Sequence, residues 1–233
     1  MSFRGGLHYD RYMTAGSAEW LMRIGEATAP PILFIPPLLE EMNRTRAFIA
    51  SIMRSAAARG YGCWLLDLPG TGESERALDA CSWSDWEQAV ADAAATLRDR
   101  SGRSLVVASV RGGALLDGAA ASPGWRFAPA EGTSLARDLV RASLLRAEEL
   151  TGPRVQLTGY TLSDRLFGEL GKATLSAAAV PLRTVRLASD RAEAELKLDG
   201  PALWRRSEPA NAPELAAALA ADLASWAERC AVC

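Results

Sequence analysis

The stretch LVVASVRGGALLDGAA, residues 105 to 120, has the layout of a nucleophile elbow. An apolar run ends at a turn of small residues, and a second run of small residues follows. The elbow motif G-x-S-x-G uses such a strained strand-to-helix turn to expose a serine. Laid over that motif, the frame reads Ser109-Val110-Arg111-Gly112-Gly113. Arg111 therefore occupies the nucleophile position, and an arginine cannot attack a carbonyl carbon.

A serine hydrolase with this elbow also needs an acid and then a histidine further along the chain. Asp190 follows the expected strand 183–189 and is the candidate acid. The histidine should come after 194–200, but the sequence there reads DGPALW, and the one histidine, His8, precedes the elbow. If the elbow motif is shifted along the sequence, Ser109 becomes the candidate nucleophile. Ser109 would then lie in the strand before the turn, and it would still have no histidine partner. The sequence therefore identifies no conventional triad.

An arginine in the elbow suggests two other roles. It would stand at a helix N-terminus, where free N–H groups and the helix dipole favour an anion, and its guanidinium adds bidentate recognition of carboxylate or phosphate. One interpretation is a pocket for a small anion or acyl carboxylate, formed by Arg111 with Glu40, Glu41, Asn43 and Asp67. The other is an internal ion pair, in which Glu40 or Glu41 binds Arg111 and closes the site. The two interpretations are compatible if a ligand competes for the arginine.

Apolar strands alternate with helices along most of the chain, which predicts one α/β domain over 1–233 with a mostly parallel sheet and helices on both faces. The segment 131–180 interrupts the alternation and predicts a small helical cap insertion. Loops after three of the strands should converge, because ligands bind at the carboxyl ends of strands in open sheets. The expected strands are 19–24, 31–37, 61–66, 104–110, 125–130, 183–189 and 194–200, and the expected helices are 40–60, 82–100, 112–121, 134–150, 163–178 and 212–230. A short exposed strand or hairpin is expected at 155–162.

Composition excludes several classes of function. The formal net charge is −2, which does not indicate a nucleic-acid or anionic-membrane partner. No apolar run approaches the roughly 18 residues of a membrane span, and no apolar leader follows the start, so a cytoplasmic protein is expected. The loop DLPGTGES (67–74) lacks the lysine of a phosphate-binding loop, and we expect no cofactor.

The cysteines give no clear metal site. Cys63 and Cys81 are separated along the chain, whereas Cys230 and Cys233 form C-A-V-C at the end. A zinc site needs about four ligands, and His8 lies at the other end of the sequence. We therefore expect no metal, and the role of the terminal pair stays open.

Five segments resemble, in order, the motifs of the exosortase A system-associated hydrolase 2 family. PPLLEEMNRTR (36–46) resembles its PP-x-x-EEMN-x-x-R signature, and DLPGTGES (67–74) its D-L-x-G-x-G-x-S loop. SVRGGALL (109–116) resembles its G-L-R-x-G-A-L-L elbow, in which arginine also holds the nucleophile position. GYTLSDRLFGEL (159–170) and GPALWRRSEPANAPEL (200–215) resemble two further segments.

The resemblance implies an α/β-hydrolase fold and a bacterial setting of exopolysaccharide production and PEP-CTERM-type protein sorting. It supplies no reaction, since fold does not determine function. The leading hypothesis is an accessory protein without a working triad, with an anion or acyl-carboxylate pocket at Arg111. The first alternative is an active hydrolase of ester, thioester or peptide bonds with an unconventional site. The second is a scaffold that binds a partner protein of that system through 131–180.

Overall fold

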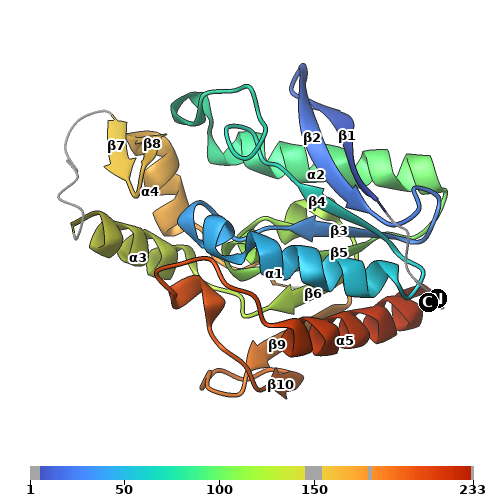
Figure 1. The fold of residues 1–233 in the computed structure, drawn as a ribbon. Coiled ribbons are helices and arrows are strands. Elements are labelled where there is room, and N and C mark those ends of the chain that lie inside the picture. Colours follow the sequence, from blue (N-terminus) through green and yellow to red (C-terminus); the bar gives the residue numbers. More distant parts are fainter. Residues whose placement is uncertain (1–5, 145–153, 178–179, 232–233) are drawn as a thin grey trace.

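The computed structural model describes residues 6–144, 154–177 and 180–231 (Figure 1). Eight strands form one sheet in the order β1-β2-β4-β3-β5-β6-β9-β10, confirming the mostly parallel sheet expected from the sequence. Only the pairs β1–β2 and β2–β4 are antiparallel. The strands are β1 (Leu7–Thr14), β2 (Ser17–Ile24), β3 (Pro31–Ile35), β4 (Gly62–Leu66), β5 (Val106–Val110), β6 (Gly124–Phe127), β9 (Leu182–Leu187) and β10 (Leu196–Leu198).

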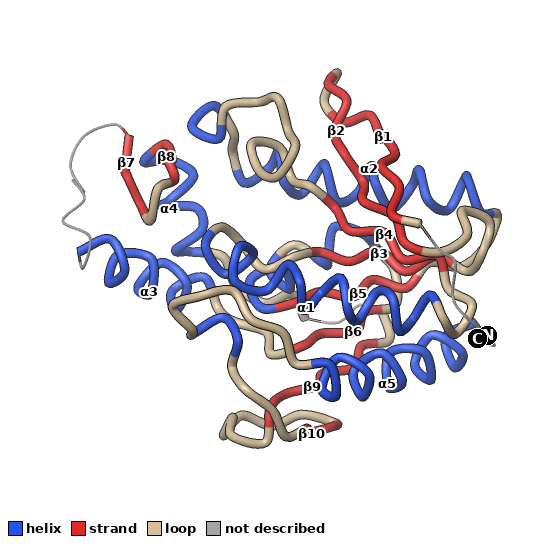
Figure 2. Tube along the Cα trace, viewed as in Figure 1, coloured by secondary structure: helices blue, strands red, loops and turns tan. Residues whose placement is uncertain are grey.

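The central strands are apolar throughout because both faces of the sheet are covered. In β3, Ile32 and Phe34 face one core layer, and Leu33 and Ile35 face the other. Helices α1 (Glu40–Ala57) and α5 (Pro213–Ala231) cover the first layer, and α2 (Trp83–Ser101) covers the second (Figures 1 and 2). Within the described ranges, no helix has the combined length and apolar character of a membrane span.

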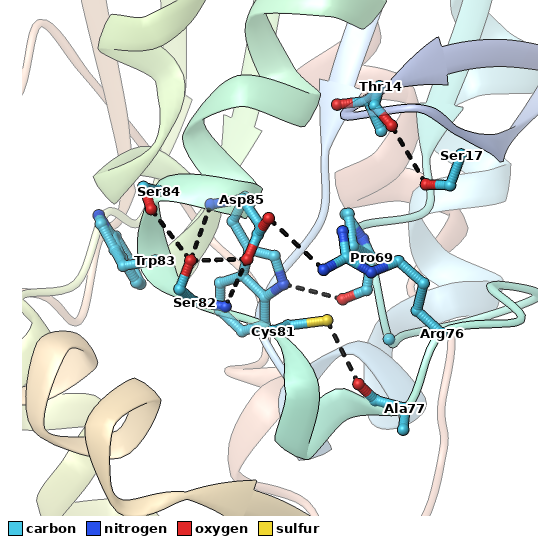
Figure 3. A network of polar contacts seen from close by, with 12 residues as sticks. Thr14, Ser17, Pro69, Arg76, Ala77, Cys81, Ser82, Trp83, Ser84 and Asp85 are labelled. Atoms are coloured by element: carbon cyan, nitrogen blue, oxygen red, sulfur yellow. Dashed lines mark hydrogen bonds and ion pairs between the residues drawn. The ribbon is translucent and has the colours of Figure 1, made fainter.

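Helix α2 begins with a capping box that also anchors the loop after β4. The Ser82 hydroxyl accepts a hydrogen bond from the Asp85 amide, and the Asp85 carboxylate accepts one from the Ser82 amide (Figure 3). Asp85 also pairs with Arg76 at 3.4 Å, and the Trp86 indole donates to the Pro69 carbonyl at 2.9 Å. These contacts hold the 67–81 loop against the carboxyl end of the sheet.

The prediction of one continuous helix over 112–121 is wrong. The chain there forms two short 3₁₀ helices, Arg111–Leu115 and Asp117–Ala120, with amide-to-carbonyl bonds three residues apart. Adjacent glycines weaken helical propensity at the start of the run. Asp117 is buried and binds Arg126 of β6, so its side chain is committed to the sheet.

Between β6 and β9 lie α3 (Gly132–Leu144), the hairpin β7 (Arg154–Leu157) and β8 (Tyr160–Ser163), and α4 (Asp164–Lys172). The hairpin expected at 155–162 is confirmed. Ser163 caps α4, but the helix expected at 163–178 ends at Lys172 and not near residue 178. Ala173 is extended, with ψ 134°, and its carbonyl accepts the Gly132 amide at 3.1 Å. The last part of the helix expected at 134–150 lies outside the described residues.

Strand β1 is absent from the sequence expectation. Its burial alternates between exposed and buried positions only in its second half, so it lacks an apolar run. A two-residue turn joins it to β2, with φ 46° at Ala15 and 79° at Gly16. Two successive positive φ angles are typical of the hairpin turn whose twist matches the strands.

Candidate functional site

Arg111 follows β5 directly and has a φ of +54°. A non-glycine residue in this region is strained, and such strain persists only where surrounding structure imposes it. This is the backbone geometry by which an elbow presents its central side chain. The strained elbow is therefore present with arginine in its central position.

The Arg111 guanidinium is bound by Glu41 at the start of α1. Nη2 lies 2.9 Å from Glu41 Oε1, and Nε lies 3.3 and 3.2 Å from the two carboxylate oxygens. Nη1 donates to the Ala128 carbonyl at 3.1 Å. The ion pair expected from Glu40 or Glu41 is thus made by Glu41, whereas Glu40 pairs with Arg44 at 3.2 Å.

The indole ring of Trp204 also contacts the Arg111 guanidinium. The Arg111 Cζ atom lies 4.6 Å from the centre of the Trp204 ring, within the range of a cation–π interaction. Trp204 follows β10, which is where a hydrolase with this elbow carries its histidine. Trp204 is not among the site residues expected from the sequence. The signal that could have identified it was its place in DGPALW, the segment without the expected histidine.

Charge and packing around the elbow do not favour the stabilisation of an oxyanion on a bound substrate. Burial raises the pKa of the Glu41 carboxyl above its ordinary value, while the charge and hydrogen bonds of Arg111 oppose that rise. An ionised Glu41 here would repel negative charge developing on a substrate oxygen. A Cβ built on Gly112 would lie 2.5 Å from Leu135 Cδ1 and 3.1 Å from Leu38 Cγ. Two leucines therefore pack against Gly112, the residue after the nucleophile position. In hydrolases with this elbow, the backbone N–H of that residue is an oxyanion donor.

Two cavities flank Trp204. The cap cavity, of about 620 Å³, lies between the start of α1, α3 and the turn of the β7–β8 hairpin. The arginine cavity, of about 350 Å³, lies on the Arg111 side and also contains Asp190. Trp204 and Arg205 line both cavities. The cap cavity is lined by Leu38, Glu40, Glu41, Arg44, Leu135, Asp138, Leu139, Arg141, Ala142, Thr158, Leu170, Trp204 and Arg205.

Asp190, the candidate acid, is held by groups near it in sequence. Its carboxylate accepts hydrogen bonds from Arg186 at 2.7 Å and from the Ala192 amide at 3.0 Å. Burial alone would raise the pKa of Asp190, but the amide and Arg186 hold it below its ordinary value. An ionised Asp190 that binds Arg186 helps define the wall of the arginine cavity.

Ser109 lies inside β5, as expected, and is fully buried. Its hydroxyl donates to Asp117 Oδ2 at 2.7 Å. Asp117 also accepts two hydrogen bonds of 2.7 Å from Arg126, whose guanidinium reaches Ser176 of the segment after α4. This buried network joins the sheet to the segment after α4, and sequence reasoning missed it.

Asn43 and Asp67 line a third, separate hollow of about 60 Å³. The Asn43 amide donates to the Tyr160 hydroxyl of β8 at 2.8 Å. The Asp67 carboxylate accepts the Glu73 amide at 3.1 Å, and burial raises the pKa of Asp67 despite that bond. The expected site residues therefore divide among three hollows: Glu40 and Glu41 in the cap cavity, Arg111 and Asp190 in the arginine cavity, and this pair in the third.

No group of three metal-ligating side chains is placed to hold a metal ion among the residues the structure describes. Cys230 is half-buried in α5, and Cys233 lies outside the described part of the chain.

No family model matches the sequence, and no curated protein matches it with significance. Solved structures do resemble the fold. Mouse alpha/beta hydrolase domain-containing protein 10 matches with a TM-score of 0.60 and 13% identity, over 95% of this chain and 99% of that one. Est1E from Butyrivibrio proteoclasticus, with bound ferulic acid, matches with a TM-score of 0.57 and 12% identity, over 76% and 77%. The thioesterase domain from the curacin biosynthetic pathway matches with a TM-score of 0.52 and 15% identity, over 96% and 99%. The chain therefore has the α/β-hydrolase fold.

Proposed function

We propose that this protein binds an acyl carboxylate, or a related phosphate-bearing molecule, beside Arg111 and does not hydrolyse it through a Ser–His–Asp triad. The observation that carries the proposal is the cluster at the elbow. Arg111 holds the nucleophile position, Trp204 stacks on it where a histidine would stand, and Glu41 binds it from the loop after β3. None of these side chains is a hydroxyl or thiol nucleophile, and none is the histidine that serves such a nucleophile as its base.

The arginine cavity supports an anionic head group. Arg111, Arg191 and Arg205 line it, and its one carboxylate, Asp190, is bound to Arg186. A guanidinium has five N–H donors. Glu41 takes the edge formed by Nε and Nη2, and Ala128 takes one hydrogen of Nη1. One hydrogen on each terminal nitrogen then remains for a carboxylate or phosphate oxygen.

The cap cavity supports an apolar tail. It shares Trp204 with the arginine cavity, and Leu135, Leu139 and Leu170 contribute to its lining. Its volume of about 620 Å³ falls within the range of small-molecule sites. A molecule with its head group by Arg111 could extend an acyl chain past Trp204 along these leucines.

The first experiment measures hydrolysis. Purified protein is incubated with p-nitrophenyl esters and acyl thioesters, alone and as the Ser109→Ala variant. We expect no turnover above the uncatalysed rate for either protein. Turnover abolished by Ser109→Ala would contradict the proposal, and turnover that survives would identify an active hydrolase with another nucleophile.

The second experiment measures binding by thermal shift and titration calorimetry, because a ligand of the native state raises its melting temperature. Octanoate and octyl phosphate are expected to stabilise the protein, and the neutral methyl octanoate is not. The paired change Arg111→Leu with Glu41→Leu should abolish the shift. The matched control removes another partly buried ion pair, through Arg183→Leu with Asp222→Leu. Equal shifts in both double variants, or none in the native protein, would refute the site.

We further propose that the protein acts in bacterial exopolysaccharide or exosortase systems. This setting is supported by the motif resemblance alone. Two of the resembling segments are in contact, through Asn43 and Tyr160. Disruption of the gene in its own host should reduce surface polysaccharide or PEP-CTERM protein sorting, and the Arg111/Glu41 double variant should fail to restore it. Full restoration by that variant would favour the scaffold alternative.

A further inference from the structure

The large apolar side chains that stay exposed in the described part of the chain all lie on β1. Leu7 is 53% exposed, Tyr9 47% and Met13 61%. Alternate residues of a strand share a face, so the three side chains form one apolar stripe. Strand β1, which carries the stripe, is the first strand in the sheet order and lies at the margin of the sheet (Figure 1).

The opposite face of β1 is part of the core. Tyr12 is buried there, and its hydroxyl donates to the Asp67 carbonyl at 3.1 Å. Asp10 binds Arg100 of α2 at 2.8 Å. Strand β1 is therefore anchored on one face, while on its other face Leu7, Tyr9 and Met13 are left exposed by the part of the chain that the structure describes.

The edge of β1 is also open to pairing. Among the strands described, β1 bonds only to β2, and the register between them is continuous from Leu7 opposite Ile24 to Thr14 opposite Ser17. Natural edge strands are usually protected by a bulge, a proline or charged side chains, lysine above all. The sequence LHYDRYMT contains neither proline nor lysine, and the continuous register contains no bulge. Its two charged side chains have partners in their own chain, since Asp10 pairs with Arg23 and Arg100, and Arg11 lies over the Trp20 ring.

We propose that β1 pairs antiparallel with β1 of a second copy of this chain, about a two-fold axis at Asp10. A continuous sheet keeps each face on one side, so only residues of the same face can lie opposite each other. With the axis at Asp10, Leu7 lies opposite the second copy's Met13, and Tyr9 opposite its Arg11. Every member of the stripe then has a cross-strand neighbour.

Charge and aromatic contacts favour this register. Each Asp10 is already paired with Arg23 and Arg100 of its own chain, so two copies can approach at the axis. Arg11 lies 4.3 Å from the centre of the Trp20 ring, and Tyr9 packs edge-on against the same ring. The second copy's Tyr9 would extend that stack. An axis at Arg11 would instead place two guanidinium groups opposite each other.

A disulfide experiment tests the register. Leu7→Cys and Met13→Cys are made separately in a background with Cys230→Ser and Cys233→Ser. Opposed Cα atoms in an antiparallel pair lie about 4.5–5.5 Å apart, within disulfide range. Oxidation of the mixture should give a cross-linked dimer. Either variant alone should not, because equivalent residues would lie roughly 20 Å apart along the strand. Cross-linking of a single variant at the rate of the mixture, or no cross-linking of the mixture, would overturn the proposal.

The oligomeric state tests the surface independently of the register. Sedimentation and light scattering should show a concentration-dependent species of twice the 24.9 kDa chain mass. Tyr9→Lys should shift the equilibrium at least tenfold toward monomer, whereas Gln88→Lys on exposed α2 surface should leave it unchanged. A native protein that stays monomeric up to its solubility limit would refute the proposal, as would a dimer unaffected by Tyr9→Lys.

Discussion

The Arg111 guanidinium and the Glu41 carboxylate form an ion pair of 2.9 Å at its closest, and both side chains are mostly buried, 12% and 13% exposed. The pair joins the elbow after β5 to the first residues of α1. It therefore determines both the electrostatics of the elbow and the packing of the loop after β3.

Removing one member of this pair should be costly. Arg111→Leu leaves the Glu41 carboxylate buried without its cation, and we expect a loss of about 3 kcal/mol in the free energy of unfolding. The double change Arg111→Leu with Glu41→Leu should recover most of that loss, since an apolar pair needs no charge compensation. Urea denaturation measures both values. The control Arg165→Ala, in an exposed pair, should leave the free energy of unfolding nearly unchanged. Equal stability of the single and double variants would contradict this account.

The two glycines after Arg111 should respond differently to alanine. A Cβ at Gly113 would lie 2.4 Å from the Pro36 carbonyl oxygen, a backbone atom that cannot move aside. A Cβ at Gly112 meets the flexible Leu135 side chain. We expect Gly113→Ala to destabilise the fold by more than Gly112→Ala, whose cost should be about 1–3 kcal/mol.

Two further variants test whether packing explains the difference between Gly112→Ala and Gly113→Ala. Adding Leu135→Ala should relieve the strain of Gly112→Ala but not of Gly113→Ala. Gly168→Ala in α4 meets nothing within 4 Å, so it should be neutral or stabilising by up to about 1 kcal/mol. Equal losses at all three glycines in thermal unfolding would show that packing at the elbow is not the cause.

The buried network behind the elbow should tolerate loss of its serine better than loss of its carboxylate. Ser109→Ala removes one hydrogen bond to Asp117 and should cost about 1 kcal/mol. Asp117→Ala leaves the Arg126 guanidinium buried and uncompensated, which should cost about 3–5 kcal/mol. Chemical denaturation of both variants tests this order, and a reversed order would show that Asp117 does not hold the network together.

Acid stability should depend on Asp222. Burial alone would raise the pKa of Asp222, but hydrogen bonds from Arg183 and Trp125 lower it below its ordinary value. A carboxyl whose pKa is lower in the folded state stabilises the protein above its unfolded pKa, and this contribution is lost as pH falls through the folded pKa. Asp222→Asn should therefore be less stable than the native protein at neutral pH. The difference should shrink below about pH 4, and a constant difference would contradict the assignment.

Much of the fold was predictable from the sequence because the central strands are apolar along their whole length. Runs such as PILFI and VVASV are buried on both faces, so their assignment did not depend on distant contacts. The amphipathic helices were also predictable from local sequence, because their apolar residues recur at helical spacing. Strand β1 was not, because its exposed stripe and short buried stretch resemble a polar segment until β2 pairs with it.

The sequence alone determined the arginine in the elbow, the missing histidine after the last strand, and two glutamates that could meet that arginine. Only the tertiary structure decided that Glu41 binds Arg111, because helix geometry aims adjacent residues in different directions and Glu40 turns to Arg44. Only the tertiary structure brought Trp204, more than 90 residues later, onto the guanidinium and placed Asn43 in a different hollow. Local patterns specify elements, whereas side chains distant in sequence meet only when the sheet order and the packing of its loops are complete.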